Sequence, residues 1–405
     1  MRKIIPYGQH YVDTIDIKSV TRAITSKSLT QGSRVLQFEK KLIAYTKSKY
    51  AVAVSSCTAG LHIACKALGF EKNSLLLTSV ISFVSSSNVA YFLGGRAQFV
   101  DIDNNTISFD LFDLELKIKK YKPKIIIVVH MAGAAYNMKK IKSLSDKYNF
   151  FIIEDCAHSL GGSYYIKNNK KNRIGSCKYS DISVFSFHPV KSITTGEGGM
   201  VTTNKKTIYK KLLRYRSHGI NKLDDKFLYK KNAYTKGKIN QWYYEMRELG
   251  YHYRITDIQC ALGISQLNKI NRFLKKRLEV AKMYDLAFIN SPYIKIIHAD
   301  ARDLSANHIY IIKINFKKLL TSRQEFMSFL EKKGIITQVH YIPIVMHPYY
   351  IDKGFKISDY PNAKKYYDEC ISIPCYYSLS RKNQKRVIFC IKEFINKKCK
   401  SISRF

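Results

Sequence analysis

One lysine at the end of an apolar segment is the residue of this sequence best placed for covalent chemistry. Lys191 follows the apolar residues 182–187 and precedes a turn rich in glycine and threonine, residues 194–199. An amine held there can form a Schiff base with a carbonyl group. A lysine at a strand end is more often a solvated cap, so this interpretation depends on the residues that accompany it.

Two other segments hold chemical groups at comparable positions. Asp155 closes the apolar residues 151–155, where a carboxylate either caps a helix or loop or pairs with a buried cation. Residues 55–59 (SSCTA) join an apolar run to a helix. Their backbone amides and the Thr58 hydroxyl could hold a phosphate, or simply cap that helix. In an open parallel sheet, such groups meet at the carboxyl ends of the strands.

A lysine, a carboxylate and a phosphate-binding segment are the groups that together bind the cofactor pyridoxal 5'-phosphate (PLP). This cofactor needs a lysine for a Schiff base, an acid that keeps its ring nitrogen protonated, and an anchor for its phosphate. Phe83, which follows the second predicted strand, either stacks on the ring or packs in the core. The sequence therefore predicts a PLP site, and it predicts no metal site.

Short apolar strands alternate with helices over residues 50–203. Strands are expected at residues 50–55, 75–79, 97–101, 124–130, 151–155, 182–187 and 199–203. Helices are expected at residues 58–68, 83–93, 111–120 and 138–148. This alternation is typical of an α/β protein whose mainly parallel sheet is covered by helices on both faces.

The pattern changes after residue 205. A basic helix is expected at residues 209–215, a polar loop at 222–241 and one long amphipathic helix at 255–277. Beyond residue 280, short strands alternate with basic helices, which indicates a smaller C-terminal α+β domain. Those strands are expected at residues 309–314 and 336–341. We therefore expect a large PLP-binding domain, residues 1–255, and a linking helix with a small domain, residues 256–405.

The charge of the chain is strongly unbalanced. Its 405 residues include 69 Lys and Arg against 30 Asp and Glu, a net charge of +39. Such a charge has two explanations. The protein can bind nucleic acids or membrane surfaces, or its composition can be biased toward basic residues that are spread over the whole surface. The compositional bias is favoured over binding, because basic residues recur throughout the chain and no nucleic-acid-binding motif accompanies them. Specific nucleic-acid binding is not expected, although the field would attract an anionic nucleotide diphosphate.

Cysteine use and hydropathy indicate the compartment. The nine cysteines are scattered singly and none forms a CxxC pair. This favours buried free thiols in a reducing compartment over disulfides or a zinc site. The first residues lack the apolar stretch of a signal peptide, and no apolar run is long enough to span a bilayer. The sequence predicts a cytoplasmic protein without a membrane anchor.

Four strings of residues resemble the DegT-type sugar-nucleotide aminotransferases, which are fold type I PLP enzymes. They are residues 28–32 (SLTQG), 154–158 (EDCAH), 185–199 and 249–259 (LGYHYRITDIQ). Four further strings resemble, within that family, the transaminases that give UDP-4-amino-4,6-dideoxy-N-acetyl-beta-L-altrosamine in pseudaminic acid synthesis. They are residues 5–8 (IPYG), 241–246 (QWYYEM), 338–343 (QVHYIP) and 359–363 (DYPNA). The resemblance runs nearly end to end and implies the fold type I architecture.

The resemblance also implies roles for individual residues. Lys191 would form the Schiff base and move a proton between substrate and cofactor. Asp155 would pair with the pyridine nitrogen, and His158 would lie near the ring face or hydroxyl of the cofactor. Phe83 would stack on the ring.

Phosphate binding by Cys57, Thr58 and Ser186 is implied in the same way. In the family, the Asn of a GYNYR string reaches the phosphate of the neighbouring subunit, which implies a homodimer with shared active sites. Here His252 stands at that position, and imidazole can also donate to phosphate. Val345 and His347 replace the usual residues of a loop on the substrate side.

The implied reaction is a transamination in two half-reactions. Glutamate would donate the amino group, and a UDP-linked 4-keto-6-deoxy-N-acetylhexosamine would accept it. One alternative is another nucleotide-linked keto sugar, of a different isomer or with a 3-keto group. The other is an inactive basic protein that binds or regulates. The retained Lys191, Asp155 and glycine-rich turn argue against an inactive protein.

Overall fold

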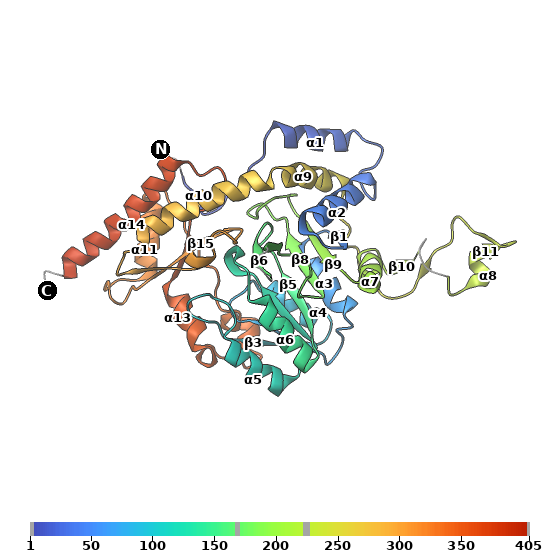
Figure 1. Cartoon of the computed structure of the whole chain (residues 1–405), viewed down its shortest axis with the longest axis horizontal. Helices are drawn as coiled ribbons and strands as arrows, with labels where there is room; N and C mark the ends of the chain where they lie inside the picture. The colour runs from blue at the N-terminus through green and yellow to red at the C-terminus, as the bar shows by residue number, and fades with distance from the viewer. Residues whose placement is uncertain (1–3, 167–170, 222–226, 403–405) are drawn as a thin grey trace.

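A seven-stranded sheet forms the centre of the protein (Figure 1). The computed structural model describes residues 4–166, 171–221 and 227–402. The strand order is β1-β9-β8-β5-β4-β2-β3. The strands are β1 (Tyr50–Val54), β2 (Leu75–Ser79), β3 (Arg96–Val100), β4 (Ile125–Val129), β5 (Phe151–Asp155), β8 (Ile182–Ser186) and β9 (Gly199–Thr203). Strand β9 is antiparallel to both of its neighbours and all other pairs are parallel, so the predicted mainly parallel sheet is confirmed.

Successive residues of the central strands are buried on opposite faces of the sheet, as the two-residue period of a strand requires. In β4, Ile125 and Ile127 lie in one hydrophobic core, while Ile126 and Val128 lie in another. The first core is closed by α3 (Cys57–Ala67), α4 (Ser85–Phe92) and α7 (Lys206–Arg216). The opposite face is covered by α5 (Leu111–Tyr121), α6 (Met138–Tyr148) and α2 (Ser33–Thr46). The sheet is thus sandwiched by helices, as expected.

The prediction of one long helix at residues 255–277 is wrong in one respect, because this segment forms two helices. Helix α9 (Asp257–Asn268) ends just before Lys269, and α10 (Ile270–Phe288) begins just after it and runs toward the C-terminal sheet (Figure 1). The Lys269 ammonium binds Asp13 and Asp16, at 2.9 and 2.5 Å, at the start of α1 (Thr14–Ile24). This contact from a distant segment fixes the break, and nothing in the local sequence reveals it.

The C-terminal part contains a three-stranded antiparallel sheet, which confirms the expected smaller α+β unit. Its strands are β14 (Ile294–Ile296), β15 (Tyr310–Ile314) and β16 (Cys370–Ile373). Its helices are α11 (Arg323–Lys332), α12 (Pro348–Ile351), α13 (Pro361–Glu369) and α14 (Arg381–Ile402). Ile5 also lies in this core and pairs with Ile335. The exact division into residues 1–255 and 256–405 stays a prediction.

The strand expected at residues 336–341 is wrong. This segment makes a single bridge, from Gln338 to Ser372 of β16, and then leaves the sheet. The Ile344 amide donates to the carbonyl of Val80, just beyond β2, at 2.9 Å. The segment is therefore irregular because it crosses from the C-terminal sheet to the large sheet.

An arm projects from the body after α7 (Figure 1). It contains β10 (Ile220–Asn221), α8 (Lys230–Ala233), β11 (Tyr234–Thr235), β12 (Lys238–Ile239) and β13 (Glu245–Met246). Of the polar loop expected at residues 222–241, residues 222–226 lie outside the described ranges, and the rest forms this short helix and hairpin. The remaining short elements are β6 (Ser163–Tyr165), β7 (Lys171–Arg173), η1 (Met131–Gly133), η3 (Ala299–Ala301), η4 (Ile344–Met346) and η5 (Ile357–Asp359).

All nine cysteines are free and seven are buried, which confirms the expected thiols. No helix within the described ranges combines the length and the apolar character needed to cross a membrane.

Candidate active site

Adjacent parallel strands β5 and β8 bring two of the predicted residues to one edge of the sheet. Asp155 is the last residue of β5 and Ser186 is the last residue of β8. Lys191 follows in the loop that joins β8 to β9. The carboxyl ends of parallel strands form this edge, so the grouping expected from the sequence is present.

A network of hydrogen bonds shapes the loop that carries Lys191. The amides of Phe187 and Thr195 bind the carbonyls of Gly198 and Phe187, at 2.9 and 3.0 Å. The Lys191 amide donates to the carbonyl of His188 at 2.9 Å, which closes a turn. Gly196 has a φ of +79°, a left-handed conformation that favours glycine. The glycine and threonine residues noted in the sequence therefore fold the loop around the lysine.

Asp155 is buried and both of its carboxylate oxygens accept hydrogen bonds. The Ser86 hydroxyl donates to Oδ2 at 2.8 Å and the Ala157 amide donates to Oδ1 at 3.1 Å. Burial raises the pKa of Asp155, while Ser86, Ala157 and the charge of Lys191 act in the opposite direction. Each oxygen keeps further acceptor capacity for a cationic partner.

A buried pair beneath this edge holds Asp155 in place. The His130 amide donates to the Asp155 carbonyl at 3.1 Å. The Tyr136 amide donates to His130 Nδ1 at 3.2 Å, so Nε2 carries the proton and donates to Glu154, 2.8 Å away. His130, Glu154 and Cys156 are close enough to suggest metal ligands. However, the His130 and Glu154 ligand atoms already bind each other, which makes this pair a support of the strand ends.

The start of α3 forms an open cradle. The Ser56 hydroxyl caps the helix by accepting from the Ala59 amide at 3.1 Å. The amides of Cys57 and Thr58 have no hydrogen-bond partner among the described residues, as is usual in a first helical turn. A Cβ on Gly199 would lie 2.7 Å from the Ser56 carbonyl, so glycine lets β9 approach the cradle closely. Free amides at a helix N-terminus are suited to phosphate.

The charges of three segments act on one another here. Burial raises the pKa of Cys57 well above its ordinary value; the charge of Asp155 adds to this and that of Lys191 opposes it. Burial lowers the pKa of Lys191 to about 8, with the Arg277 charge contributing, although Cys57 and Asp155 act the other way. The structure therefore brings Lys191, Asp155 and Cys57 close enough for their charges to act on one another.

His158 lies buried beside these residues and keeps one nitrogen free. Its Nε2 is 3.0 Å from the Tyr341 hydroxyl, and its Nδ1 has no partner among the described residues. Its ring lies against the ring of His308, with centroids 4.5 Å apart. Burial lowers the pKa of His158 well below its ordinary value, and the charges of Lys191 and His340 contribute, so the imidazole is neutral.

Phe83 and His252 occupy different environments. Phe83 is 56% exposed, which excludes simple core packing, and its ring centroid lies 6.1 Å from that of Tyr341. His252 is also exposed, but it lies beside His218, with ring centroids 5.3 Å apart. Within one chain, His252 makes no hydrogen bond, ion pair or ring contact with Lys191, Asp155 or His158.

Two residues of the site were not predicted from the sequence. Ser86 lies in a run of serines at the start of α4, where nothing local distinguishes it from a helix cap. Tyr341 comes from the segment that was expected to be a strand. Val345, which the resemblance placed in a loop on the substrate side, is buried in the first core at 1% exposure.

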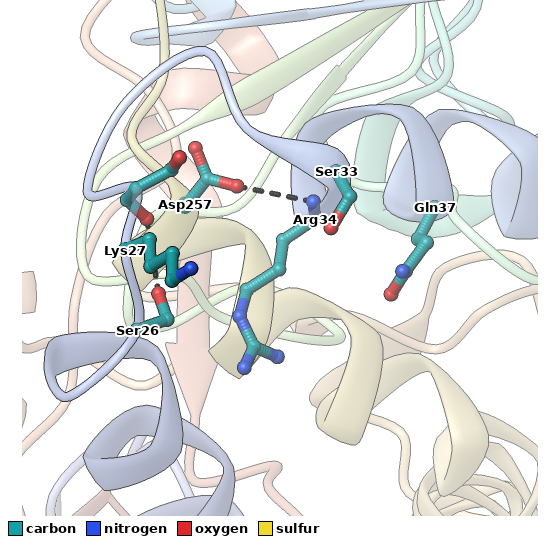
Figure 2. Close-up of a pocket in the computed structure, with 7 residues that line it drawn as sticks. Ser26, Lys27, Ser33, Arg34, Gln37 and Asp257 are labelled. Carbon is teal, nitrogen blue, oxygen red and sulfur yellow. Dashed lines mark hydrogen bonds between the residues drawn. The ribbon is translucent and has the colours of Figure 1, made fainter.

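The strings at residues 28–32 and 249–259 meet in a separate polar cavity of about 280 Å³ (Figure 2). Asp257 accepts from the amides of Gly32 and Arg34, at 2.7 and 3.0 Å, and so joins α2 to α9. A Cβ on Gly32 would lie 2.6 Å from the Asp257 carboxylate, so this position requires glycine. Neither Lys191 nor Asp155 lines the cavity. Within one chain, Gly32 and Asp257 of these strings therefore join α2 to α9.

Comparisons with known proteins agree with this geometry. A model of the DegT/DnrJ/EryC1/StrS aminotransferase family matches residues 11–392. The UDP-4-amino-4,6-dideoxy-N-acetyl-beta-L-altrosamine transaminase of Campylobacter jejuni is 35% identical over 399 residues, 97% of this chain and 99% of that protein. The spore coat polysaccharide biosynthesis protein SpsC of Bacillus subtilis is 34% identical over 396 residues, 96% of this chain and 97% of that protein. The PLP form of the sugar aminotransferase Spr1654 from Streptococcus pneumoniae superposes with a TM-score of 0.84 at 26% identity, covering 98% and 99% of the two chains.

Proposed function

Because the chain belongs to the DegT/DnrJ/EryC1/StrS aminotransferase family, we propose a specific substrate for this PLP-dependent sugar-nucleotide aminotransferase. It transfers the amino group of L-glutamate to a UDP-linked 4-keto-6-deoxy-N-acetylhexosamine. The product is UDP-4-amino-4,6-dideoxy-N-acetyl-beta-L-altrosamine, an intermediate of pseudaminic acid synthesis. The observation that carries the transaminase chemistry is the juxtaposition of Lys191 with buried Asp155. The 35% identity to the Campylobacter jejuni transaminase over nearly the whole chain supports the choice of sugar.

The residues present fit PLP. The free amides of Cys57 and Thr58 at the start of α3 suit the phosphate. The Asp155 carboxylate has lone pairs left for the ring nitrogen, and the unpartnered Nδ1 of His158 is a buried polar atom that a bound cofactor would satisfy. Ser186, beside the cradle, supplies a further hydroxyl. Bound PLP supplies an electron sink for breaking a bond at the amino-bearing carbon.

Each of these residues then has a defined task. Asp155 keeps the ring nitrogen protonated, because a buried carboxylate is best neutralised by a nearby cation. Lys191 would hold the cofactor covalently and would move a proton when free, and an amine whose pKa is lowered to about 8 is suited to that exchange near neutral pH. The exposed ring of Phe83 would stack on the cofactor ring. Together these residues would orient the cofactor.

The pKa of Lys191 makes a testable prediction for the cofactor-free protein. Only the neutral amine attacks the aldehyde, so the rate constant for covalent capture of PLP should rise about tenfold per pH unit below pH 8. It should level off above pH 8, since the pKa is lowered to about 8. Stopped-flow absorbance between pH 6.5 and 10 measures this rate, with the Lys191→Ala protein as the baseline for other lysines. A rate that keeps rising to pH 10, as for an ordinary lysine, would contradict the lowered pKa.

We also propose a homodimer in which each subunit completes the other's site. The projecting arm exposes large apolar side chains, which a monomer would leave in water. They are Leu228, Tyr229, Ile239, Trp242, Tyr244 and Met246, with exposed fractions of 55 to 76%. His252 is exposed too, so it is available to the phosphate of a neighbouring subunit. The nine free thiols support a reducing, cytoplasmic location.

One experiment tests the substrate and the assembly together. Light scattering of the purified protein should give twice the chain mass of 46.9 kDa. The same sample, with glutamate and a set of nucleotide-linked 4-keto and 3-keto sugars, should aminate the UDP-linked 4-keto-6-deoxy-N-acetylhexosamine fastest. NMR of the product identifies the isomer. A clear preference for a different keto sugar would replace the proposed substrate, and a mass of one chain would contradict the dimer.

A further inference from the structure

A tyrosine from the C-terminal part of the chain reaches the buried histidine of the site. The Tyr341 hydroxyl lies 3.0 Å from His158 Nε2. Burial raises the pKa of Tyr341, and the Asp155 charge adds to this, so the phenol keeps its proton. Among the described residues the hydroxyl has no other acceptor than His158. A buried hydroxyl without an acceptor is costly, so its proton is donated to Nε2.

This hydrogen bond decides which nitrogen of His158 carries the proton. A neutral imidazole has one N–H and one acceptor nitrogen. Because Nε2 accepts from Tyr341, the proton must be on Nδ1. That nitrogen is buried and unpartnered, so His158 presents a single hydrogen-bond donor with no acceptor among the described residues.

We propose that Tyr341 is a positioning residue that fixes His158 as an Nδ1–H donor toward an acceptor on bound PLP. The proposal rests on the placement of the cofactor beside His158 given above. Tyr341 does not act on the substrate directly; it selects one of two tautomers that would otherwise both be populated. Because the donor tautomer is fixed before PLP binds, the free energy needed to select that tautomer does not weaken binding.

The segment that carries Tyr341 is itself held by the C-terminal part. The Tyr366 hydroxyl of α13 donates to the His340 carbonyl at 2.5 Å. His340 Nδ1 lies 2.8 Å from the Ser372 hydroxyl of β16. The Tyr341 ring also contacts Phe83 and lies 6.0 Å from the His158 ring. The position of the phenol is therefore set by α13 and β16, and through it these elements act on the cofactor site.

A double-mutant cycle on PLP affinity tests this role without using catalysis. Apo-proteins carrying Tyr341→Phe, His158→Ala, or both are titrated with PLP, and the dissociation constant is measured by absorbance. Tyr341→Phe keeps the ring and removes only the hydroxyl, and it should weaken binding about three- to tenfold, the usual worth of one hydrogen bond. The double variant should bind as weakly as His158→Ala alone, because Tyr341 acts through His158.

The matched control is Tyr284→Phe. The Tyr284 hydroxyl also makes a hydrogen bond, to the Pro374 carbonyl at 2.9 Å, but it does so in the C-terminal core, where Tyr284 is fully buried. The Tyr284→Phe substitution should lower the melting temperature by an amount similar to that of Tyr341→Phe, and it should leave the affinity for PLP unchanged. If Tyr341→Phe also leaves affinity unchanged, or if its effect multiplies that of His158→Ala, the proposed role is wrong. If His158→Ala leaves affinity unchanged, the placement of the cofactor beside His158 fails instead.

Discussion

Lys191→Ala protein should form no detectable amino sugar from glutamate and the keto-sugar nucleotide. The substitution removes both the covalent link to PLP and the group that moves the proton. Loss of a positioned acid–base group alone costs up to about 10⁴-fold in rate. Product formation measured by liquid chromatography and mass spectrometry should therefore fall by roughly that factor or more. Added methylamine should restore a small part of it, since a free amine can take over the proton transfer.

Lys205→Ala is the matched control. Lys205 is an exposed lysine that binds Asp181 at 2.6 Å, beyond the end of β9 that is remote from the loop carrying Lys191. Its removal should leave the rate unchanged. A Lys191→Ala protein with more than a tenth of the wild-type rate and no need for added amine would contradict the assigned role of Lys191.

Asp155→Asn should lower kcat by roughly 10²- to 10³-fold, the effect of removing one preorganised electrostatic group. Asparagine keeps the size of the side chain, but it carries no charge to keep the ring nitrogen protonated. The KM for the keto sugar should change little, because Asp155 contacts the cofactor. Steady-state rates with both substrates measure the two constants separately.

Asp181→Asn is the control for that substitution. Asp181 accepts from the Ile152 amide at 2.9 Å, at the opposite end of the same strands. Its neutralisation should cost some stability and leave kcat unchanged. If Asp155→Asn retains a kcat within threefold of wild type, the carboxylate does not act on the ring nitrogen.

The central sheet could be predicted because its signals are local. Strand β5 (Phe151–Asp155) ends as expected because β-branched residues stop at a pair of acidic ones. Since parallel strands end at a common edge, the meeting of Asp155 with Lys191 also follows from the sequence. Local pattern and topology together therefore predicted which side chains meet at this edge of the sheet.

The remaining features depend on contacts between distant segments. The break at Lys269 is fixed by Asp13 and Asp16, more than 200 positions away in the chain. Tyr341 reaches His158 only because its segment leaves the C-terminal sheet, and a pattern of alternating residues cannot reveal that. His252 is exposed in a single chain, so the role proposed for it needs a second copy. Such contacts are set by tertiary packing, which overrides local propensity.

The most direct test of the account is to locate the residue that holds PLP. The purified protein should be yellow, and borohydride should reduce the linkage and fix the cofactor to one lysine. Peptide mass spectrometry should then find the added pyridoxyl phosphate on the peptide that contains Lys191. A label on a different lysine, or a Lys191→Ala protein that still forms the reduced adduct, would contradict the assignment.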